Sequence, residues 1–273
     1  MTSVAVTRPP LRNHFWRVFF IGGLISYRAL FYWISPWQYI PTMLGAPLFQ
    51  ILFFVYLGRA TGVGSTSFFV VGNSIQICSM AGIYGMTMAI ANERSFQTLS
   101  PILATPSNRV ALFLGRGLPV LITGLQTCLF GFLVSALILG FRPSLGEIPG
   151  LALAVLVTSA SCTGFGMALG SIGLRVRDVF LVSNIAYFLM LLICGVEVPI
   201  GRLPFFLRDL AQFLPLTHGI AAGRLVADGH GLGAALPDIG IELLVGSVWA
   251  VIAYLLFAYF ERSGRRSGVF DRL

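Results

Sequence analysis

Residues 148–174 read IPGLALAVLVTSASCTGFGMALGSIGL, a run without a single ionisable side chain. A helix needs about 20 residues to cross the hydrocarbon core of a bilayer, whereas a membrane-spanning strand shows about ten residues of alternating polarity. Within the run, Leu151–Val157 is apolar at every position, which excludes such alternation. The stretch therefore predicts a transmembrane helix.

Further uncharged stretches lie on both sides of this run. They cover residues 29–58, 60–92, 117–141, 179–196 and 243–260. Each is long enough to cross a bilayer, and ionisable residues fall between or beside the stretches and not deep within them. The composition agrees, because 56% of the residues are hydrophobic and 10% are charged, against roughly 25% charged in soluble domains. We expect an all-α integral membrane protein with six transmembrane helices and exclude a soluble globule.

The positions of these stretches predict three segments of the chain. Residues 1–36 form a cytoplasmic N-terminus with an amphipathic interfacial helix, 37–261 form the six-helix transmembrane domain, and 262–273 form a cytoplasmic tail. The expected spans are 37–58, 67–91, 107–140, 148–174, 179–197 and 238–260. Two longer connections lie between them, namely a cytoplasmic loop at 92–106 and an outer region at 198–237.

The N-terminal segment contains four arginines and no acidic residue. Trp16, Phe19 and Phe20 lie among these arginines, in a pattern typical of a helix in the membrane interface. No small-x-small cleavage site follows the apolar part, so we expect no removed signal peptide. We expect the arginines to face the lipid headgroups and the aromatic rings to face the acyl chains.

Arginine supplies all 18 basic side chains, and the chain contains no lysine. If the N-terminus is cytoplasmic, 13 arginines fall on the cytoplasmic side and five on the other, so the positive-inside rule places both termini in the cytoplasm. The net charge of +8 therefore reflects topology, and we expect no nucleic-acid partner. Without lysine there is no Walker A sequence, so this chain does not bind ATP through a P-loop.

Metal and catalytic motifs are missing from the sequence as well. The four cysteines lie in different expected spans without CxxC or Cys/His spacing, and we interpret them as small core residues. The three histidines form no ligand pair and no HExxH motif. We expect no metal, no catalytic residue and no cofactor in this chain.

The cytoplasmic loop carries clear helix signals. Asn92 is a good N-cap, Glu93 suits the positive end of a helix, and Thr105-Pro106 is typical of the start of the next span. The loop is either an ordinary structured turn or a rigid polar helix against which a separate motor subunit would push.

The outer region is too apolar for a free loop. Pro204 suits the first turn of a short helix, and Pro215 ends that helix. A second helix begins with Thr217 as its N-cap and finishes at Asp228-Gly229, where glycine supplies a left-handed cap. We expect two short helices that re-enter the outer leaflet.

The second expected span carries a polar and aromatic stripe. It consists of Asn73, Gln76, Met80, Tyr84 and Thr87. At the 3.6-residue period of a helix these side chains fall within an arc of about 80 degrees. In the fifth expected span, Asn184, Tyr187 and Leu191 share one face. The two faces either pack and hydrogen-bond between helices or line a path for a substrate.

Several of these motifs resemble the ABC-2 type permeases, the membrane subunits of many bacterial ATP-binding-cassette exporters. The cytoplasmic loop carries Glu93-Arg94, Thr98-Leu99 and Leu103-Ala104-Thr105-Pro106, followed by Arg109. The interfacial helix, the turn Arg175-Val176-Arg177-Asp178 and the outer stretch 198–224 agree with the same family. That outer stretch is most similar to permeases of the daunorubicin-resistance type, and more distantly to nodulation-factor and polysaccharide exporters.

The resemblance implies six transmembrane helices per subunit and a dimer with an identical or related permease. Two cytosolic ATPase subunits, which bind ATP and Mg²⁺, would dock beneath it. The loop at 92–106 would be the coupling helix that sits in a cleft of the ATPase, and the turn at 175–178 would make a smaller contact. The coupling contacts implied in this way are Glu93, Arg94, Thr98, Leu99, Arg175 and Asp178.

In this family the second and fifth spans line the substrate path, so the resemblance implies that the polar stripe contacts the substrate. The residues assigned to this path are Asn73, Gln76, Met80, Tyr84, Asn184 and Tyr187. The expected substrate is an amphipathic drug or natural product, a lipid or a glycan, which ATP-driven export moves outward. The expected location is the cytoplasmic (inner) membrane of a bacterium, in contact with membrane lipid.

Two other classes of function fit the sequence less well. The alternative is a secondary carrier or channel that works without ATP, but the spans show no deep ionisable residue and the loops show no inverted repeat. An intramembrane hydrolase would need a nucleophile and a base within the bilayer, and no GxSG serine with a membrane-embedded histidine occurs. We therefore expect no enzymatic activity in this chain.

Overall fold

The computed structural model describes residues 14–33, 37, 40–62, 64–95, 109–173, 176 and 178–267. In chain order the first helices are α1 (His14–Trp33), the π-helical turn η2 (Ile40–Gly45), α3 (Ala46–Thr61), α4 (Thr66–Ser95), α6 (Arg109–Gly115), α7 (Gly117–Ile138), α8 (Ile148–Gly173) and α9 (Val179–Ile193). They are followed by the 3₁₀ turn η3 (Ile200–Arg202), α10 (Phe205–Gln212), α11 (Thr217–Ala227) and α12 (Gly231–Ser267). The described residues contain no strand, so the expected all-α architecture is confirmed for this part of the chain.

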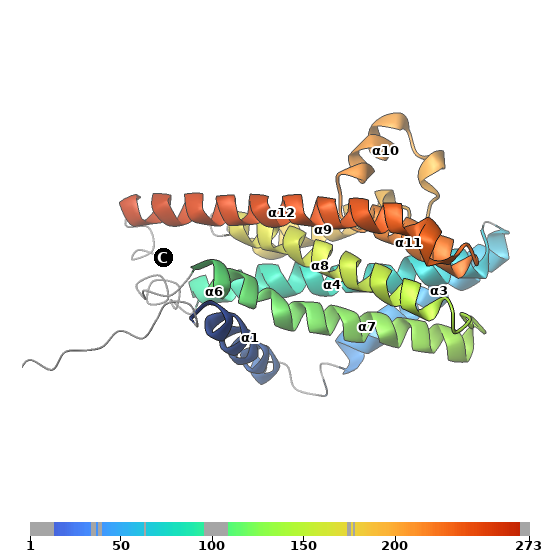
Figure 1. Ribbon diagram of the computed structural model, residues 1–273, viewed down its shortest axis with the longest axis horizontal. Coiled ribbons are helices and arrows are strands. Elements are labelled where there is room, and N and C mark those ends of the chain that lie inside the picture. The colour runs from blue at the N-terminus through green and yellow to red at the C-terminus, as the bar shows by residue number, and fades with distance from the viewer. Residues whose placement is uncertain are drawn as a thin grey trace, which may run out of the picture.

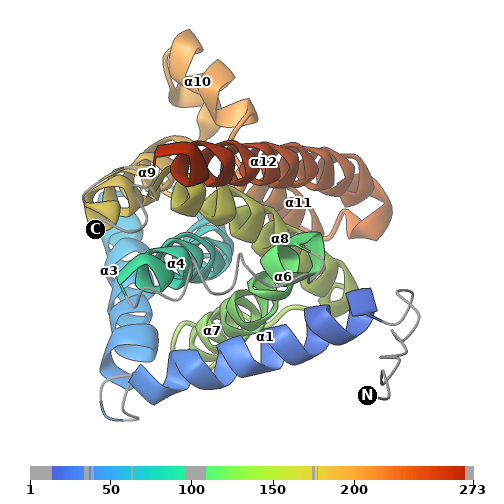
Figure 2. The ribbon, with the colours of Figure 1, turned by 90° about the vertical axis from the view of Figure 1, so that its left-hand side faces the viewer.

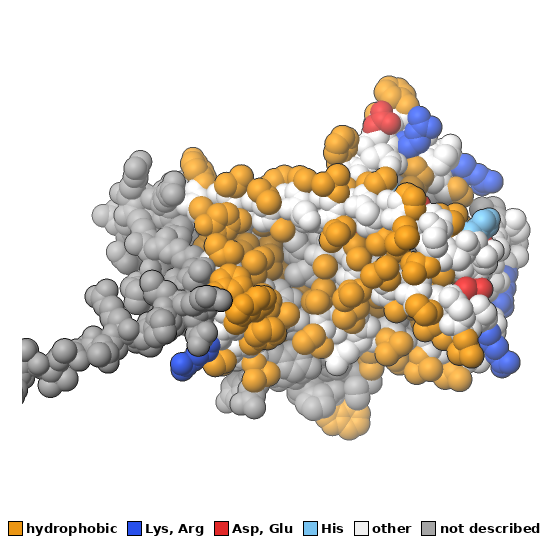
Figure 3. Space-filling view, in the orientation of Figure 1, with side chains coloured by type: hydrophobic (Ala, Val, Ile, Leu, Met, Phe, Trp, Pro, Cys, Tyr) orange, Lys and Arg blue, Asp and Glu red, His pale blue; other side chains and the backbone are white. Residues whose placement is uncertain are grey.

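The long helices form one elongated bundle, in which α4, α7, α8 and α12 run along the long axis (Figure 1). Within the described residues, four apolar helical stretches are long enough to cross a membrane, namely Thr66–Ala89, Val110–Ile138, Ile148–Gly173 and Gly231–Phe260. Hydrophobic side chains are spread over the middle of the visible face, and charged side chains gather at the end that carries α10 and α11 (Figure 3). This distribution is that of a multi-pass membrane protein.

The first and fifth expected spans correspond to shorter helices. α3 has 16 residues and α9 has 15, which at 1.5 Å per residue gives about 24 and 22 Å, against a hydrocarbon core of about 30 Å. α3 follows η2 without a break, so the helical segment from Ile40 to Thr61 has 22 residues. The structure thus has four long apolar helices and two shorter ones where the sequence predicts six spans.

The third expected span, 107–140, is divided into two helices. α6 ends at Gly115 and α7 begins at Gly117, with Arg116 between them. Glycine disfavours the helical conformation, so the two glycines weaken the helix at this point. Arg116 is buried, with 7% of its surface exposed. The division leaves α7 aligned with the bundle, while α6 packs against α1.

α1 crosses the bundle at the end opposite α10. In the end-on view α4 and α7 point toward the viewer, whereas α1 runs across them (Figure 2). α1 packs against α6 and α7, and glycine permits a close approach, because a Cβ on Gly23 would lie 2.8 Å from the carbonyl oxygen of Gly115. Trp16 and Phe20 are exposed, as expected for a helix in the membrane interface.

α4 occupies the centre of the bundle. It contacts α3, α7, α8, α9 and α11, although it has the lowest mean hydropathy of the four long apolar stretches. Glycines let α8 approach it closely, since a Cβ on Gly166 would overlap the carbonyl oxygen of Gly82. A helix with polar side chains is thereby enclosed by protein and kept away from lipid, where those side chains would be costly.

The region between α9 and α12 contains short helices, as the sequence predicts. The predicted N-cap of the second helix, Thr217, is wrong. α11 lies against α4, α8 and α12, whereas α10 projects from the side of the bundle (Figures 1 and 2). α11 begins at Thr217, but the N-cap residue is Leu216, which has a positive φ of 91°. The Thr217 hydroxyl does not cap the helix, because it donates to the carbonyl oxygen of Ala211 at 2.6 Å.

Replacing Gly166 with alanine is expected to lower the stability by about 1–3 kcal/mol, because the added methyl meets the backbone of Gly82, which cannot turn aside as a flexible side chain can. Thermal unfolding of the detergent-solubilised protein measures this effect. The control is Gly240→Ala on α12, where a Cβ meets no atom within 4 Å and alanine favours the helix. Equal unfolding temperatures for Gly166→Ala and the wild type would contradict the close contact of α4 with α8.

Candidate functional site

The stripe predicted on α4 faces the interior of the bundle. Asn73 and Gln76 are completely buried, and Met80 and Tyr84 are partly buried against the main apolar core. Buried polar groups in native proteins nearly always meet polar partners. Asn73 finds such a partner on α3 and Tyr84 finds one on α9.

Hydrogen bonds join α4 directly to α9. The Tyr84 hydroxyl donates to Oδ1 of Asn184 at 2.8 Å, and the Ser183 hydroxyl donates to the hydroxyl of Thr87 at 2.9 Å. The rings of Tyr84 and Tyr187 also pack together, with their centroids 5.6 Å apart. The structure therefore brings the two predicted faces into contact.

A residue of α3 completes the connection. Gln50 accepts a hydrogen bond from the Tyr187 hydroxyl at 3.1 Å and donates one to Oδ1 of Asn73 at 3.1 Å, so it links α9 to α4. Gln50 was not predicted, because a single polar residue in an apolar helix produces no periodic stripe. The one available signal was an isolated amide within the apolar stretch 46–58.

These residues form what we call the polar network. It comprises Gln50, Asn73, Gln76, Tyr84, Asn184 and Tyr187. Gln76 is the exception within it: its side chain lies next to Tyr187, but neither its amide nitrogen nor its carbonyl oxygen makes a hydrogen bond of good geometry among the described residues. An unpaired polar group in the interior costs about 1–3 kcal/mol. Gln76 therefore marks unused hydrogen-bonding capacity within the network.

Two charged residues lie at the end of the network nearest α11. Glu197, in the turn after α9, has both carboxylate oxygens buried and without a hydrogen-bond partner in the described part of the chain. Burial raises the pKa of Glu197 to about 7, against the opposing influence of the Asn73 amide and the Arg224 charge. Arg224 of α11 donates to the carbonyl oxygens of Phe68 and Val196 at 3.1 and 3.0 Å and stacks on the Phe68 ring. Burial lowers the pKa of Arg224 to about 10.

A further acidic residue lies deeper inside a membrane-spanning helix than its place near the start of the expected span 238–260 indicated. Glu242 is fully buried in the apolar stretch Gly231–Phe260 of α12. Its carboxylate accepts hydrogen bonds from the backbone N–H groups of Leu216 and Gly219 at 2.9 and 3.0 Å. Backbone donors at the start of a helix have no partner within the helix, so this carboxylate caps α11 and lies at the positive end of its dipole.

Other contacts hold the same turn against α12. Trp249 donates from Nε1 to the carbonyl oxygen of Phe213 at 2.9 Å, and Nδ1 of His218 lies 3.8 Å from Oδ1 of Asp238. The positive φ of Leu216 costs about 1–3 kcal/mol in a residue with a Cβ, and these contacts offset that cost. α12 thus fixes the position at which α11 begins.

α4 extends into the expected coupling loop. It runs without a break to Ser95, so Asn92 is not the cap of a separate helix as the sequence predicted. Glu93 and Arg94 are good helix formers and continue the last turn of α4. Their side chains lie outside the described part of the structure.

At the second expected ATPase contact, Asp178 is the N-cap of α9. Its Oδ1 accepts a hydrogen bond from the Leu181 N–H at 3.0 Å, which satisfies one of the free donors at the start of that helix. The remaining residues assigned to ATPase contacts, Thr98, Leu99 and Arg175, lie outside the described residues.

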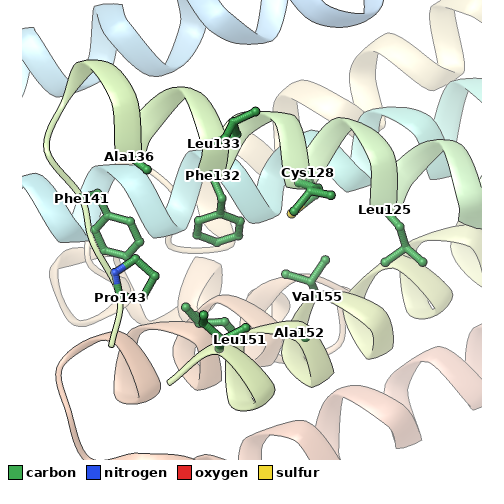
Figure 4. A pocket seen from close by; sticks show the side chains of 12 residues that line it. Leu125, Cys128, Phe132, Leu133, Ala136, Phe141, Pro143, Leu151, Ala152 and Val155 are labelled. Atoms are coloured by element: carbon green, nitrogen blue, oxygen red, sulfur yellow. The ribbon is translucent and has the colours of Figure 1, made fainter. Parts of the chain in front are cut away.

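A separate groove lies between α7 and α8, in the half of the bundle nearer α10. It has a volume of about 380 Å³, and its walls are apolar side chains such as Leu125, Phe132, Phe141 and Leu151, together with the thiol of Cys128 (Figure 4). No hydroxyl, amide or charged side chain lines it. The groove therefore suits a hydrocarbon chain and has no group that would orient a polar ligand.

Metal ligands do not gather in the described part of the chain. No group of three or more His, Cys, Asp or Glu side chains there is arranged to hold a metal ion. All four cysteines are free and buried, in the core positions where a free cysteine behaves as a small hydrophobic residue.

Known proteins place this membrane domain in a family. The family model described as ABC-2 type transporter matches residues 21–226, more than half of the chain. The chain therefore belongs to the ABC-2 type transporter family, and the resemblance carried by its motifs is confirmed. The matched region is a transport subunit, a permease, and not an ATPase domain.

Curated relatives include two proteins described as probable multidrug ABC transporter permease YbhR, one from Escherichia coli strain K12 and one from Escherichia coli O157:H7. Each is 22% identical to this chain over 186 residues, which cover 67% of this chain and 48% of the relative. The chain spans about half the length of the curated relatives it matches.

Glu242→Leu is expected to destabilise the protein by about 2–4 kcal/mol, because the buried N–H groups of Leu216 and Gly219 lose their acceptor. Glu242→Gln keeps one acceptor oxygen and should cost about half as much. The measurements are thermal unfolding in detergent and hydrogen exchange of the first turn of α11. Unchanged exchange in α11 of Glu242→Leu would contradict the capping role.

Proposed function

We propose that this chain is the permease subunit of a bacterial ABC exporter and forms the transmembrane path for ATP-driven efflux of an amphipathic substrate. The substrate is a drug or natural product, a lipid or a glycan. The observation that carries this proposal is the polar network, which joins α3, α4 and α9 inside a domain of the ABC-2 family. The description of the distant relatives as probable multidrug permeases supports the drug class.

α4 provides a mechanical link between the proposed coupling loop and the polar network. It is one helix from Thr66 to Ser95, about 45 Å long at 1.5 Å per residue. Glu93 lies in its last turn, and Tyr84 and Gln76 lie farther along the same helix. A push by the ATPase on the loop would therefore move the network as part of a rigid element.

α9 provides a second link of the same kind. Asp178 caps its first turn, and Asn184 and Tyr187 follow on the same helix. Both proposed ATPase contacts thus lead into the two helices that the Tyr84–Asn184 hydrogen bond joins. In the proposed cycle, ATP binding changes the relative positions of α4 and α9, and the inward and outward states bind the substrate differently.

The polar network suits substrate recognition better than the groove between α7 and α8. Amide and hydroxyl groups orient the polar part of a ligand, whereas hydrocarbon walls accept any apolar group. We assign the groove to an acyl chain of membrane lipid. The proposed substrate path comprises Asn73, Gln76, Met80, Tyr84, Asn184 and Tyr187.

The proposed transporter contains two permeases, identical or related, and two ATPase subunits that bind ATP and Mg²⁺. Each permease has six transmembrane helices, of which α3 and α9 are the first and fifth. In this proposal the chain comprises a cytoplasmic segment 1–36, the transmembrane domain 37–261 and a cytoplasmic tail 262–273. Both termini lie in the cytoplasm, so the end that carries α10 and α11 faces outward from the bacterial inner membrane.

A mild-detergent pull-down of the tagged chain from its native membrane is expected to recover a P-loop ATPase at one copy per permease. Glu93→Arg should leave the protein in the membrane, reduce this recovery and uncouple export, because reversal of the charge opposes the ATPase contact. The measurements are the stoichiometry of the co-purified ATPase and ATP-dependent transport in inverted vesicles.

The matched control is Asp209→Arg, which reverses an exposed charge on α10 at the opposite end of the bundle. It should recover the ATPase as the wild type does. Recovery of the chain alone, with solute movement that needs no ATP, would favour the secondary carrier or channel. Full transport by Glu93→Arg would remove that residue from the coupling mechanism.

Tyr84→Phe removes the hydroxyl that binds Asn184 and keeps the ring. We expect this change, like alanine at Asn73, Gln76 or Asn184, to alter KM or the maximal rate of export about two- to tenfold, which corresponds to a net hydrogen bond of about 0.5–1.5 kcal/mol. Efflux and ATPase stimulation by several amphiphiles are measured, with Tyr254→Phe on the exposed face of α12 as the control. If none of these variants changes either quantity for any amphiphile, the network only packs the helices.

A further inference from the structure

The polar network ends, toward α11, in buried atoms that lack hydrogen-bond partners. They are both carboxylate oxygens of Glu197, both amide atoms of Gln76 and Nε of Arg224, each without a partner in the described part of the chain. Gln76 is completely buried. Native structures satisfy nearly all buried polar groups with protein, water or ligand. The convergence of so many free polar atoms therefore points to a binding site.

The order of residues along α4 indicates which charge a ligand beside Glu197 must carry. Arg224 is held near one end of α4, where it donates to the carbonyl oxygen of Phe68 and where a Cβ on Gly72 would lie 2.7 Å from its Nη2. The hydrogen bonds that the structure describes for Arg224 go to backbone carbonyls and not to Glu197. Gln76 lies farther along α4. Arg224 therefore lies on the side of Glu197 nearer the start of α4, and the polar network lies on the side nearer the end of α4.

The network side of Glu197 is rich in oxygen acceptors. The Glu197 oxygens and the Gln76 carbonyl are free, and an ammonium group offers donors together with the positive charge that a buried carboxylate needs. The rings of Tyr84 and Tyr187 add a surface that attracts cations. An anion would meet the carboxylate unfavourably, and a neutral hydrocarbon would leave its two oxygens without a hydrogen-bond donor.

We propose that Glu197 and Gln76 bind the ammonium group of a cationic amphiphile, whose apolar part extends along α4 and α9. This inference rests on the proposed function and names the class of substrate that the path selects. Glu197 supplies the countercharge, Gln76 accepts a further hydrogen bond, and Met80 and Tyr84 contact the apolar part. Anionic amphiphiles are rejected by the same carboxylate.

The ionisation of Glu197 makes binding dependent on pH. Its pKa is about 7 because it is buried, and a cation prefers the ionised form. The charged and titratable groups that interact with it are Arg224 from α11 and Tyr187 from α9, and arginine and tyrosine side chains keep their charge state between pH 6 and pH 8. Cation binding should therefore strengthen about tenfold from pH 6 to pH 8, as the carboxyl group loses its proton.

The test uses the purified permease–ATPase complex and two fluorescent probes. Dansylcadaverine carries a protonated amine between pH 6 and pH 8, and its N-acetyl derivative is neutral. Binding is measured by dansyl fluorescence. We expect the wild type to bind the cationic probe at least about tenfold more tightly than the neutral probe, as for a hydrogen bond to a charged group. Glu197→Gln should lose this preference and the pH dependence, and Glu197→Asp should keep part of both.

Asp209→Asn is the matched control, since it removes an exposed acidic charge from α10 and should bind both probes as the wild type does. If Glu197→Gln fails to fold, Gln76→Leu serves as the second variant. It removes two unpaired amide atoms, so it should raise the unfolding temperature while it weakens binding of the cation. Equal affinity of the wild type for both probes, or an equal loss for both in Glu197→Gln, would show that water satisfies these atoms and would overturn the inference.

ATP-driven transport of the same probes into inverted vesicles separates this inference from the proposed function. Cation-selective binding without ATP-driven transport would retain the site and reject the exporter. ATP-driven transport of both probes with equal KM, in the wild type and in Glu197→Gln alike, would retain the exporter and reject the site.

Discussion

The close approach of α4 to α8 at Gly82 and Gly166 places the least apolar of the long helices in the middle of the bundle. Lipid offers no hydrogen bonds, so the polar groups of α4 must find their partners within the protein. This requirement gives a reason for the positions of α3 and α9, which bring Gln50, Asn184 and Tyr187 to the polar face of α4. Glycine packing on one side of α4 and hydrogen bonding on the other thus both follow from the need to keep its polar groups away from lipid.

Helical periodicity makes the polar stripes of α4 and α9 predictable from the sequence. A period of 3.6 residues places Asn73, Gln76 and Tyr84 on one side of α4, and the hydrogen bond from Tyr84 to Asn184 joins that side to α9. Periodicity has no means of finding Gln50, because one amide has no period. Periodicity also does not reveal that the Gln76 amide stays unpaired, because pairing depends on distances between side chains of three helices.

Division of the chain at its charged residues located the helices but did not reveal that two acidic groups are buried. Glu197 and Glu242 directly border the uncharged stretches 179–196 and 243–260, so the division says nothing about their burial. Local propensity likewise favours Thr217 as the cap of α11, because a hydroxyl is a common cap. A carboxylate from α12 accepts from two N–H groups at once, and Leu216 adopts an unfavourable φ in that arrangement. Such contacts join residues far apart in the sequence, which no local pattern records.

The two carboxylates differ in their contacts, and α11 connects them. Glu242 has both oxygens occupied by backbone N–H groups and holds the first turn of α11 to α12. Glu197 has both oxygens free and lies beside Arg224, near the other end of α11. Because Arg224 is bonded to the backbone of Phe68 on α4, a movement of α4 changes the environment of Glu197 while α12 keeps the start of α11 in place. In the proposed cycle, the force that reaches α4 from the ATPase would therefore act on Glu197, the residue proposed to bind the cation.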